Sequence, residues 1–434
     1  MSKLIKEGRT TINRGLKYLA ERTTKFCVPT TFEDHFLDQL NKLNEKYKDL
    51  NARVYEVYGS FRTIFGTGRA ATILPKVDEE KFARHVEQAH AYGIEVAFTL
   101  NPVCMNLVEY TEWGHKSLDE LLTNLSIMKV DTLIITIPYL IEYVAKNYPE
   151  FKINASSICY IDSLERALMY EKLGADRLTL NEDINRCFKL LKLIRKEVKA
   201  DLEVIANNGG LLKCPFKTYH DSINAHVSQY VVEDKVGFSY LPYPFMRCTL
   251  ERLSNHKEII RAPWFRPEDI KYYTEIGIDY IKIAGRGLPA KVLLRLIEAY
   301  LSGRYEGDIY ALIDNSYLHF SKDMFDPSAK PLPPLRISID NRSLDGWYEY
   351  FVKNDPPCLI GCIGCDYCER VAKKVVKTDP ELERRYIERI KDMINRLASR
   401  KPPIKLKEKE GGGLILEREG LPPCVGEYQI CSAG

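Results

Sequence analysis

Cysteine is the residue whose spacing in this chain points most directly to chemistry. Of the twelve cysteines, four lie within one run of eleven residues. They are Cys358, Cys362, Cys365 and Cys368. Gaps of two residues let successive thiolates converge on one metal ion or cluster, and Gly361 and Gly364 let backbone amides approach the sulfurs. The run therefore predicts a metal centre.

The spacing does not by itself choose the metal. Four thiolates suit structural zinc and an iron–sulfur cluster alike. The first three cysteines also match the spacing of radical S-adenosylmethionine enzymes, but those enzymes carry the motif early in a barrel, and Cys368 would leave no open iron. We therefore expect a fully ligated centre, with zinc and iron–sulfur both open.

Composition indicates a globular protein with room for a barrel and an appendage. The chain has 434 residues, 45% of them hydrophobic and 28% charged, and its net charge of +3 does not indicate RNA or another nucleic acid as a partner. Met1 to Arg22 lacks the apolar core of a signal peptide, and no apolar run reaches the roughly 18 residues that span a membrane. We therefore expect a cytoplasmic protein whose cysteines serve metal chemistry rather than disulfides.

Short β-rich segments alternate with amphipathic helical segments from residue 25 to residue 301. The predicted strands are 25–32, 53–58, 94–100, 132–137, 152–157, 176–181, 201–207 and 279–283. Eight such units in series, without a dinucleotide-binding fingerprint, favour a closed barrel over an open sheet. The predicted fold class is α/β, a TIM-type (β/α)8 barrel with a C-terminal Cys-rich metal-binding extension.

The expected organisation has four parts. They are a basic leader (1–22), the barrel (23–306), the Cys-rich extension (307–400), and a linker with a tail (401–434). Gly411 to Gly413 would form a flexible spacer in the last part. A spacer before a short peptide suggests that Leu414 to Gly434 is a tethered peptide substrate or partner, with an ordinary disordered terminus as the alternative.

Polar residues follow most of the predicted strands, where TIM barrels place their chemistry. They are Arg62, Arg69, Asn101, Ser156, Asn181, Glu182, Asn207, Asn208, Lys282 and Arg286. We expect Lys282 and Arg286 to hold a carboxylate or phosphate during catalysis. A cofactor is expected to bind near four of the others, namely Arg62, Arg69, Asn101 and Asn207.

The seventh predicted strand and the connection after it carry further candidates. Cys214 and Cys248 could supply two metal ligands with partners from elsewhere, although free cysteine also packs as an ordinary small apolar residue. Glu203 is a candidate catalytic acid or base if it faces inward and its pKa is perturbed, and His220 could be a proton carrier or a metal ligand. The alternative for Glu203 is an outward-facing residue paired with a helix lysine.

An ordered set of segments between Lys25 and Tyr305 resembles the peptidase U32 family. The segments are the loop 59–69, Gln88–His90, Thr99–Asn101, Asn154–Ser157, Leu173–Leu178, Glu203 with its cysteine-bearing loop, Arg266–Asp269 and Gly277–Arg286. The resemblance implies a TIM-type barrel. It also implies an oxygen-sensitive [4Fe-4S] cluster on four cysteines, since better understood members use one in oxygen-independent hydroxylation of ubiquinone precursors, tRNA or ribosomal RNA. Some of them apparently take prephenate as the oxygen donor, and the peptidase name reflects an older collagenase-like assignment.

The resemblance also bears on the metal. Cys214 matches a family cysteine by position, and Cys248 matches a later one, so iron–sulfur is favoured over zinc. The chain departs from many relatives at Gly209 and Gly210, where further cysteines are common. The C-terminal run therefore either completes a cluster in the barrel or holds a separate one.

These observations give one leading hypothesis and two alternatives. The leading hypothesis is an iron–sulfur enzyme that modifies a substrate, such as a ribosomal peptide or RNA, without molecular oxygen, by hydroxylation or related redox chemistry. The first alternative is a metal-dependent peptidase of the U32 type, although no Ser-His-Asp, Cys-His-Asn or His-Glu-x-x-His signature stands out. The second is a non-catalytic binding protein stabilised by zinc.

Overall fold

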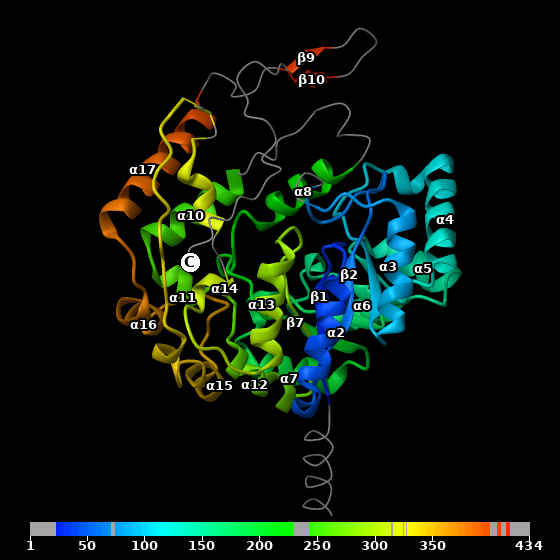
Figure 1. The fold of residues 1–434 in the computed structure, drawn as a ribbon, viewed down its shortest axis with the longest axis horizontal. Helices are drawn as coiled ribbons and strands as arrows, with labels where there is room; N and C mark the ends of the chain where they lie inside the picture. Colours follow the sequence, from blue (N-terminus) through cyan, green and yellow to red (C-terminus); the bar gives the residue numbers. More distant parts are fainter. Residues whose placement is uncertain are drawn as a thin grey trace, which may run out of the picture.

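A closed barrel of eight parallel strands forms the centre of the molecule (Figure 1). The computed structural model describes residues 23–70, 74–229, 243–313, 316–323, 325–326, 328–399, 406–408 and 414–416. The strands are β1 (Thr24–Pro29), β2 (Ala52–Gly59), β3 (Glu95–Leu100), β4 (Thr132–Ile135), β5 (Lys152–Ala155), β6 (Arg177–Thr179), β7 (Asp201–Ile205) and β8 (Tyr280–Lys282). They pair in sequence order, and β8 closes the ring on β1. The predicted TIM-type barrel is confirmed.

Helices surround the barrel because each presents one apolar face to the strands. They include α2 (Phe36–Lys46), α3 (Glu79–Ala91), α4 (Glu112–Ile127), α5 (Pro138–Asn147), α6 (Leu164–Lys172), α7 (Phe188–Glu197) and α13 (Ala290–Leu301). In α7, for example, Phe188, Leu191 and Ile194 are buried. The long connection from β7 to β8 contains α8 (Lys217–Ser228), α10 (Tyr243–Ser254), α11 (Lys257–Arg261) and α12 (Lys271–Glu275).

Two separate apolar clusters divide the core. The larger one lies between the strands and the helices and continues into the C-terminal extension through residues such as Trp347 and Tyr348. The smaller one lies inside the barrel and consists of Cys27, Tyr58, Ala97 and Ile134. Since alternate residues of a strand point to opposite faces, these four share the interior with the polar side chains described below.

The C-terminal extension packs against one side of the barrel. It contains α14 (Tyr310–Ile313), α15 (Glu349–Asn354), α16 (Tyr367–Val375) and α17 (Pro380–Leu397). Helix α16 lies against α11, and α17 lies against α10 (Figure 1, left). A proline-rich stretch at residues 331–334 packs against α17, because Tyr386 donates to the Pro333 carbonyl over 2.9 Å, and the adjoining Leu335 is buried.

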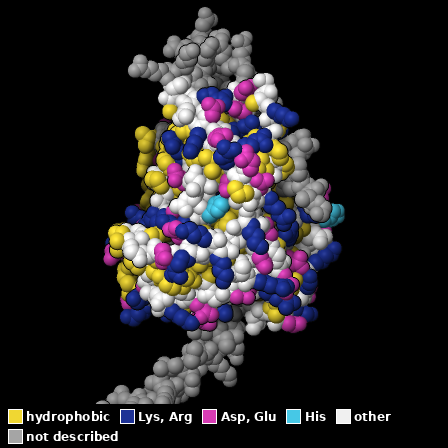
Figure 2. Space-filling model, turned by 90° about the vertical axis from the view of Figure 1, so that its left-hand side faces the viewer, with side chains coloured by type: hydrophobic (Ala, Val, Ile, Leu, Met, Phe, Trp, Pro, Cys, Tyr) yellow, Lys and Arg dark blue, Asp and Glu magenta, His cyan; other side chains and the backbone are white. Residues whose placement is uncertain are grey.

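Positive and negative side chains are intermixed on the face that the extension covers (Figure 2). Exposed ion pairs such as Lys373–Glu369 and Arg384–Glu381 account for part of this pattern. Side chains of both charge signs therefore lie next to each other on this face.

Little of the predicted leader and tail falls within the described residues. Leader 1–22 lies outside them, as do the triglycine spacer and residues 417–434. Two short strands, β9 (Leu406–Glu408) and β10 (Leu414–Leu416), form an antiparallel pair where the sequence showed no strand pattern. In the described part of the chain, no helix is long and apolar enough to cross a membrane.

Candidate active site

Four charged side chains form a network inside the barrel. Arg177 on β6 donates to both carboxylate oxygens of Glu56 on β2, over 2.8 and 2.9 Å. Its guanidinium also donates to Glu203 on β7 over 3.4 Å, and Lys282 on β8 donates to Glu203 over 3.0 Å. All four side chains are buried. Because two positive and two negative charges cancel, the network is neutral without a further ion.

Neutral side chains complete the hydrogen bonding of the two carboxylates. Thr132 donates to Glu56 over 2.9 Å. Thr179 and Asn154 donate to Glu203 over 2.6 and 3.2 Å. Such bonds offset part of the desolvation cost that a buried ion pair incurs.

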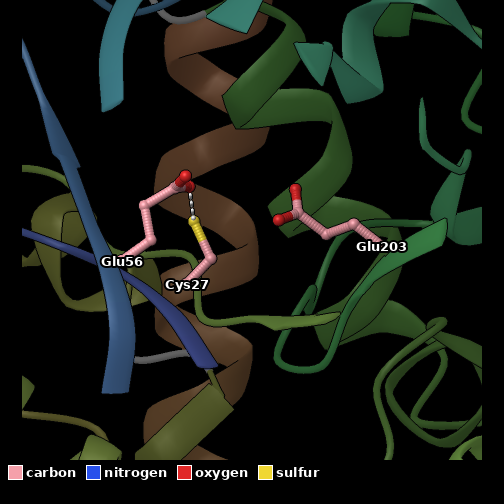
Figure 3. A group of neighbouring side chains, drawn as sticks. All are labelled: Cys27, Glu56 and Glu203. Carbon is pink, nitrogen blue, oxygen red and sulfur yellow. Dashed lines mark hydrogen bonds between the residues drawn. The ribbon is translucent and has the colours of Figure 1, made fainter. Parts of the chain in front are cut away.

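Cys27, Glu56 and Glu203 are the one group of three among the described residues whose metal-ligand atoms lie within 4.8 Å of one another (Figure 3). The Cys27 thiol donates to Glu56 over 3.0 Å. Burial raises the pKa of Cys27 and the charge of Glu56 adds to it, so the sulfur stays protonated. Arg177 and Lys282 already bind the two carboxylates. A metal ion would have to displace both cations, so these residues fit a salt-bridge network better than a metal site.

The network fixes the protonation states of two predicted catalytic residues. Burial alone would raise the pKa of Glu203, but Lys282 and Arg177 lower it to about 2. Burial likewise opposes the charge on Lys282, yet Glu203 raises its pKa above the usual value. Both groups are therefore charged at neutral pH. The anion that Lys282 holds is Glu203, and this ionised Glu203 is a poor proton acceptor.

Two arginines lie close together at the mouth of the barrel, which we define as the loops that follow the carboxyl ends of the strands. Arg286, after β8, donates to Thr67 over 2.7 Å and to Thr99 over 3.0 Å. Burial and then repulsion from Arg69 lower the pKa of Arg286 to about 10, so it remains protonated at neutral pH. Within the described chain, no carboxylate forms an ion pair with either arginine at 4.0 Å or less. The mouth therefore offers two positive charges to an anionic ligand.

The loop that carries Arg69 is held by Asn101 at the end of β3. The side-chain oxygen of Asn101 accepts from the Thr67 hydroxyl over 3.0 Å and from the Gly68 backbone amide over 2.9 Å. Its amide nitrogen donates to Ser156 over 3.1 Å. These bonds give Asn101 a part in positioning the loop.

The other two predicted cofactor-binding residues also lie at strand ends. Asn207 donates to the Ala284 carbonyl over 2.8 Å and accepts from the Ala284 amide over 2.7 Å, which ties the end of β7 to the end of β8. Arg62 lies in the loop after β2 and lines a small pocket there with Thr67 and Ser228. Contact of these residues with a cofactor stays a prediction.

Helix α8 brings further polar groups to the mouth. Lys217 forms an ion pair with Glu182, which follows β6, and Asn208 donates to the same Glu182 oxygen over 2.7 Å. Burial alone would lower the pKa of Lys217, but Glu182 outweighs it and raises the pKa.

The next turn of α8 carries His220 and Asp221. Burial, Arg69 and Lys217 lower the pKa of His220 to about 4, so its ring is neutral at pH 7. Tyr160, after β5, donates to Asp221 over 2.6 Å. Burial raises the pKa of Asp221 against the effects of Tyr160, Lys217 and Arg69. The predicted proton carrier His220 thus lies beside cations that oppose its protonation.

The predicted metal ligands form two groups. Cys214 and Cys248 lie near each other. Burial and the charge of Cys248 raise the pKa of Cys214 to about 11, while a backbone hydrogen bond from Phe216 and the charge of Lys217 oppose this rise. Lys217 and Asp183 also act on Cys214, which places this pair beside the mouth. The pair supplies two thiols where a closed site needs four ligands.

The second group contains the four C-terminal cysteines. Burial raises the pKa of Cys368 to about 11; Arg186 opposes this, while Cys358, Cys362 and Cys365 add to it. A fifth thiol that the sequence reasoning missed, Cys187, precedes α7. Burial and then Cys358 raise the pKa of Cys187 to about 12.

The spacing of the sulfurs in this C-terminal group bears on the metal, whose identity stays a prediction. Thiolates that share one zinc ion lie about 4 Å apart, whereas no three sulfurs in the described residues come within 4.8 Å of one another. The ligands of a cubane cluster stand farther apart, because each binds a different iron. Gly361 (φ +122°) and Gly364 (φ +69°) supply turns that glycine adopts readily.

Sequence reasoning found the mouth arginines but missed groups that the fold brings near them. Glu56 and Arg177 lie on strands among apolar neighbours. A charged residue in such a strand was the sequence feature that could have indicated a buried ion pair. Lys217 and Asp221 lie in the β7–β8 connection, where an i, i+4 pair of polar residues on the buried face of a helix was the signal.

Comparison with known proteins identifies relatives of this chain. The family model for peptidase family U32 matches residues 41–211. An uncharacterized protease of Methanocaldococcus jannaschii is 29% identical over 343 residues, which cover 79% of this chain and 94% of that protein. The solved structure of the U32 peptidase Mk0906 is 21% identical, with a TM-score of 0.47, and the match covers 62% of this chain and 95% of that one.

Proposed function

Because this chain belongs to peptidase family U32, we propose that it is an iron–sulfur enzyme that modifies an anionic substrate at the barrel mouth without molecular oxygen, by hydroxylation or related redox chemistry. The observation that carries the proposal is the pair of neighbouring cations, Arg69 and Arg286, which has no paired carboxylate among the described residues. Two neighbouring, partly buried like charges repel each other, so an anion between them relieves a cost that the folded protein already bears.

The chain's own residues determine what the mouth can bind. Arg286 is oriented by the hydroxyls of Thr67 and Thr99, which leaves other guanidinium hydrogens for a carboxylate or phosphate. Asn101 fixes the loop that carries Arg69. The neutral ring of His220 and the Tyr160–Asp221 pair supply groups that can exchange a proton with the bound ligand.

The C-terminal thiols are the proposed cluster ligands. Cys358, Cys362, Cys365 and Cys368 would hold a [4Fe-4S] cluster, which supplies electron transfer when bound. Arg186 stabilises the thiolate forms of Cys358 and Cys368. The loop from Asn181 to Cys187 joins the mouth to this region, since Glu182 lies at one end and Cys187 at the other.

Anaerobic purification tests the proposal. We expect about four iron and four acid-labile sulfide per chain and a paramagnetic signal after reduction. Replacement of Cys358 and Cys362 by serine should remove the iron, the acid-labile sulfide and the paramagnetic signal. One zinc per chain in a colourless sample would overturn the iron–sulfur assignment and support a protein stabilised by zinc. The substrate class is then sought by mass spectrometry of peptides and RNA fragments incubated with the loaded enzyme under nitrogen.

A peptidase is the second candidate, because the M. jannaschii relative is named a protease. Among the described residues, the Thr30 hydroxyl lies 2.8 Å from the His85 imidazole, and both side chains are buried. Peptide cleavage that persists in the metal-free protein and is lost in R286M would favour this candidate over the redox enzyme.

A further inference from the structure

Helix α8 lies over one end of the barrel (Figure 1). Lys217 at its start pairs with Glu182, which follows β6. Ser228 at its end donates to the Thr67 carbonyl over 2.7 Å, and Thr67 follows β2. In a ring of eight strands, β2 and β6 stand on opposite sides. The helix therefore spans the mouth. Its length from Lys217 to Ser228 is roughly 16 Å, at a rise of 1.5 Å per residue.

The face of α8 that looks into the mouth is polar. Its buried residues are Asp221, Asn224, Ala225 and Ser228. Asp221 and Ser228 both contact loops at strand ends, and Asn224 lies between them on the same face, three residues from one and four from the other. Asn224 is therefore placed over the middle of the mouth.

Two buried polar atoms at the mouth have no hydrogen-bond partner in the described part of the chain. One is the side-chain nitrogen Nδ2 of Asn224, a residue that is 2% exposed. The other is Oε2 of Glu182, which is 6% exposed and whose Oε1 already accepts from Lys217 and Asn208. An unpaired buried donor or acceptor is costly, and a bound ligand removes that cost.

We propose that the ligand at the mouth donates a hydrogen bond to Glu182 Oε2 and accepts one from Asn224 Nδ2. This proposal rests on the anion site between Arg69 and Arg286. The ligand class is then a carboxylate or phosphate that also carries an amide or a hydroxyl. Lys217 already neutralises Glu182, and the surrounding cations repel an ammonium group, so the donor on the ligand is a neutral one.

Two isosteric probes separate the donor contact from the charge. N-acetylglycine has a carboxylate, a carbonyl and an amide N–H, and 4-oxopentanoate has a methylene in place of that N–H. We expect the native protein to bind N-acetylglycine roughly tenfold more tightly, as measured by calorimetry, because only this probe donates to Glu182.

Two variants and a control test the assignments. In E182Q, the amide nitrogen should face the ligand because Lys217 and Asn208 both need an acceptor, so the preference for N-acetylglycine should disappear. N224A should weaken both probes by a similar factor of about five, since both keep the carbonyl. S222A, on the exposed side of α8, should bind both as the native protein does.

Melting temperature separates contact with the ligand from structural support. N224A removes an unpaired buried donor, so its melting temperature should be equal to or above that of the native protein without a probe. Equal affinity of the native protein for the two probes, or a preference that survives in E182Q, would overturn this inference and leave the anion site standing. If neither probe binds at millimolar concentration, the proposed anion site fails and this inference fails with it.

Discussion

Arg177 binds Glu56 through two parallel hydrogen bonds, of 2.8 and 2.9 Å, in the interior of the barrel. The Tyr280 ring lies against the same guanidinium, 3.8 Å from its central carbon. Where many barrels have branched apolar side chains, this one has an ionic layer under its mouth. The layer is neutral, so it does not cancel the positive charge of the arginines above it.

We expect E56Q to lower the free energy of unfolding by roughly 3–5 kcal/mol, because it leaves the charge of buried Arg177 without its main partner. Denaturant titration at pH 7 measures this. A double variant, E56L with R177M, should recover most of the loss, since apolar residues of similar size need no charge partner. E306Q, which breaks the exposed Arg342–Glu306 pair, is the control and should cost about 1 kcal/mol or less. A loss in E56Q no larger than in this control would contradict the account of the network.

Iron content should depend on the C-terminal cysteines and not on Cys27. C358S combined with C362S should lose iron and sulfide together. C27S should keep both, because the Cys27 thiol is protonated and bonded to Glu56. The iron and sulfide contents of anaerobic samples of the two variants are measured by metal and sulfide analysis. Loss of metal in C27S alone would instead place the ion with Glu56 and Glu203.

Affinity for a small carboxylate should fall when either mouth arginine loses its charge. We expect R286M to raise the dissociation constant of N-acetylglycine by roughly 10- to 100-fold, the usual value of a charge-assisted hydrogen bond. R286K should recover part of the affinity, since it keeps the charge but not the forked geometry. R342M, on the exposed surface, serves as the control. Equal binding by R286M and R342M would rule out the anion site.

Acid should destabilise the protein in part through His85. Burial lowers the pKa of His85 from 6.5 to about 4, so the folded state favours the neutral ring. The stability from this group is fully present above pH 6.5 and is lost as the pH falls toward 4, to a limit of roughly 3 kcal/mol. H85Q keeps a hydrogen-bonding group beside Thr30, and its unfolding free energy should therefore depend less steeply on pH in this window. Parallel curves for the two proteins would refute this.

Gly66 is required where the mouth loop meets α8. Its φ is +76°, and an added Cβ would lie 2.5 Å from the Ser228 hydroxyl. G66A should therefore lower both the melting temperature and the affinity for N-acetylglycine. Gly303 has a similar φ of +66° with no atom within 4 Å of an added Cβ, so G303A isolates the cost of the backbone conformation. The inferred contact between the loop and α8 is wrong if G66A loses no more stability than G303A.

Local sequence patterns were sufficient to predict the barrel and the end of it at which its chemistry is expected. All eight strands could be predicted because strand and helix periodicity is local, and the rule that parallel barrels act at the strand ends then pointed to Arg69 and Arg286. The cysteine run was equally visible, because consecutive ligands of one metal lie close together in the chain.

Which charged side chains pair with each other could be learned only from the folded chain. Glu203 and Lys282 both lie on strands, and nothing in their spacing of 79 residues shows that they neutralise each other while Arg286 stays available at the mouth. Glu182 was visible in the sequence as a polar residue at a strand end, whereas Asn224 carried no signal. The unpaired atoms of both become evident only once α8 is placed over the strand ends. The physical reason is that burial and charge pairing set the state of an ionisable group, and both depend on residues that are distant in the chain.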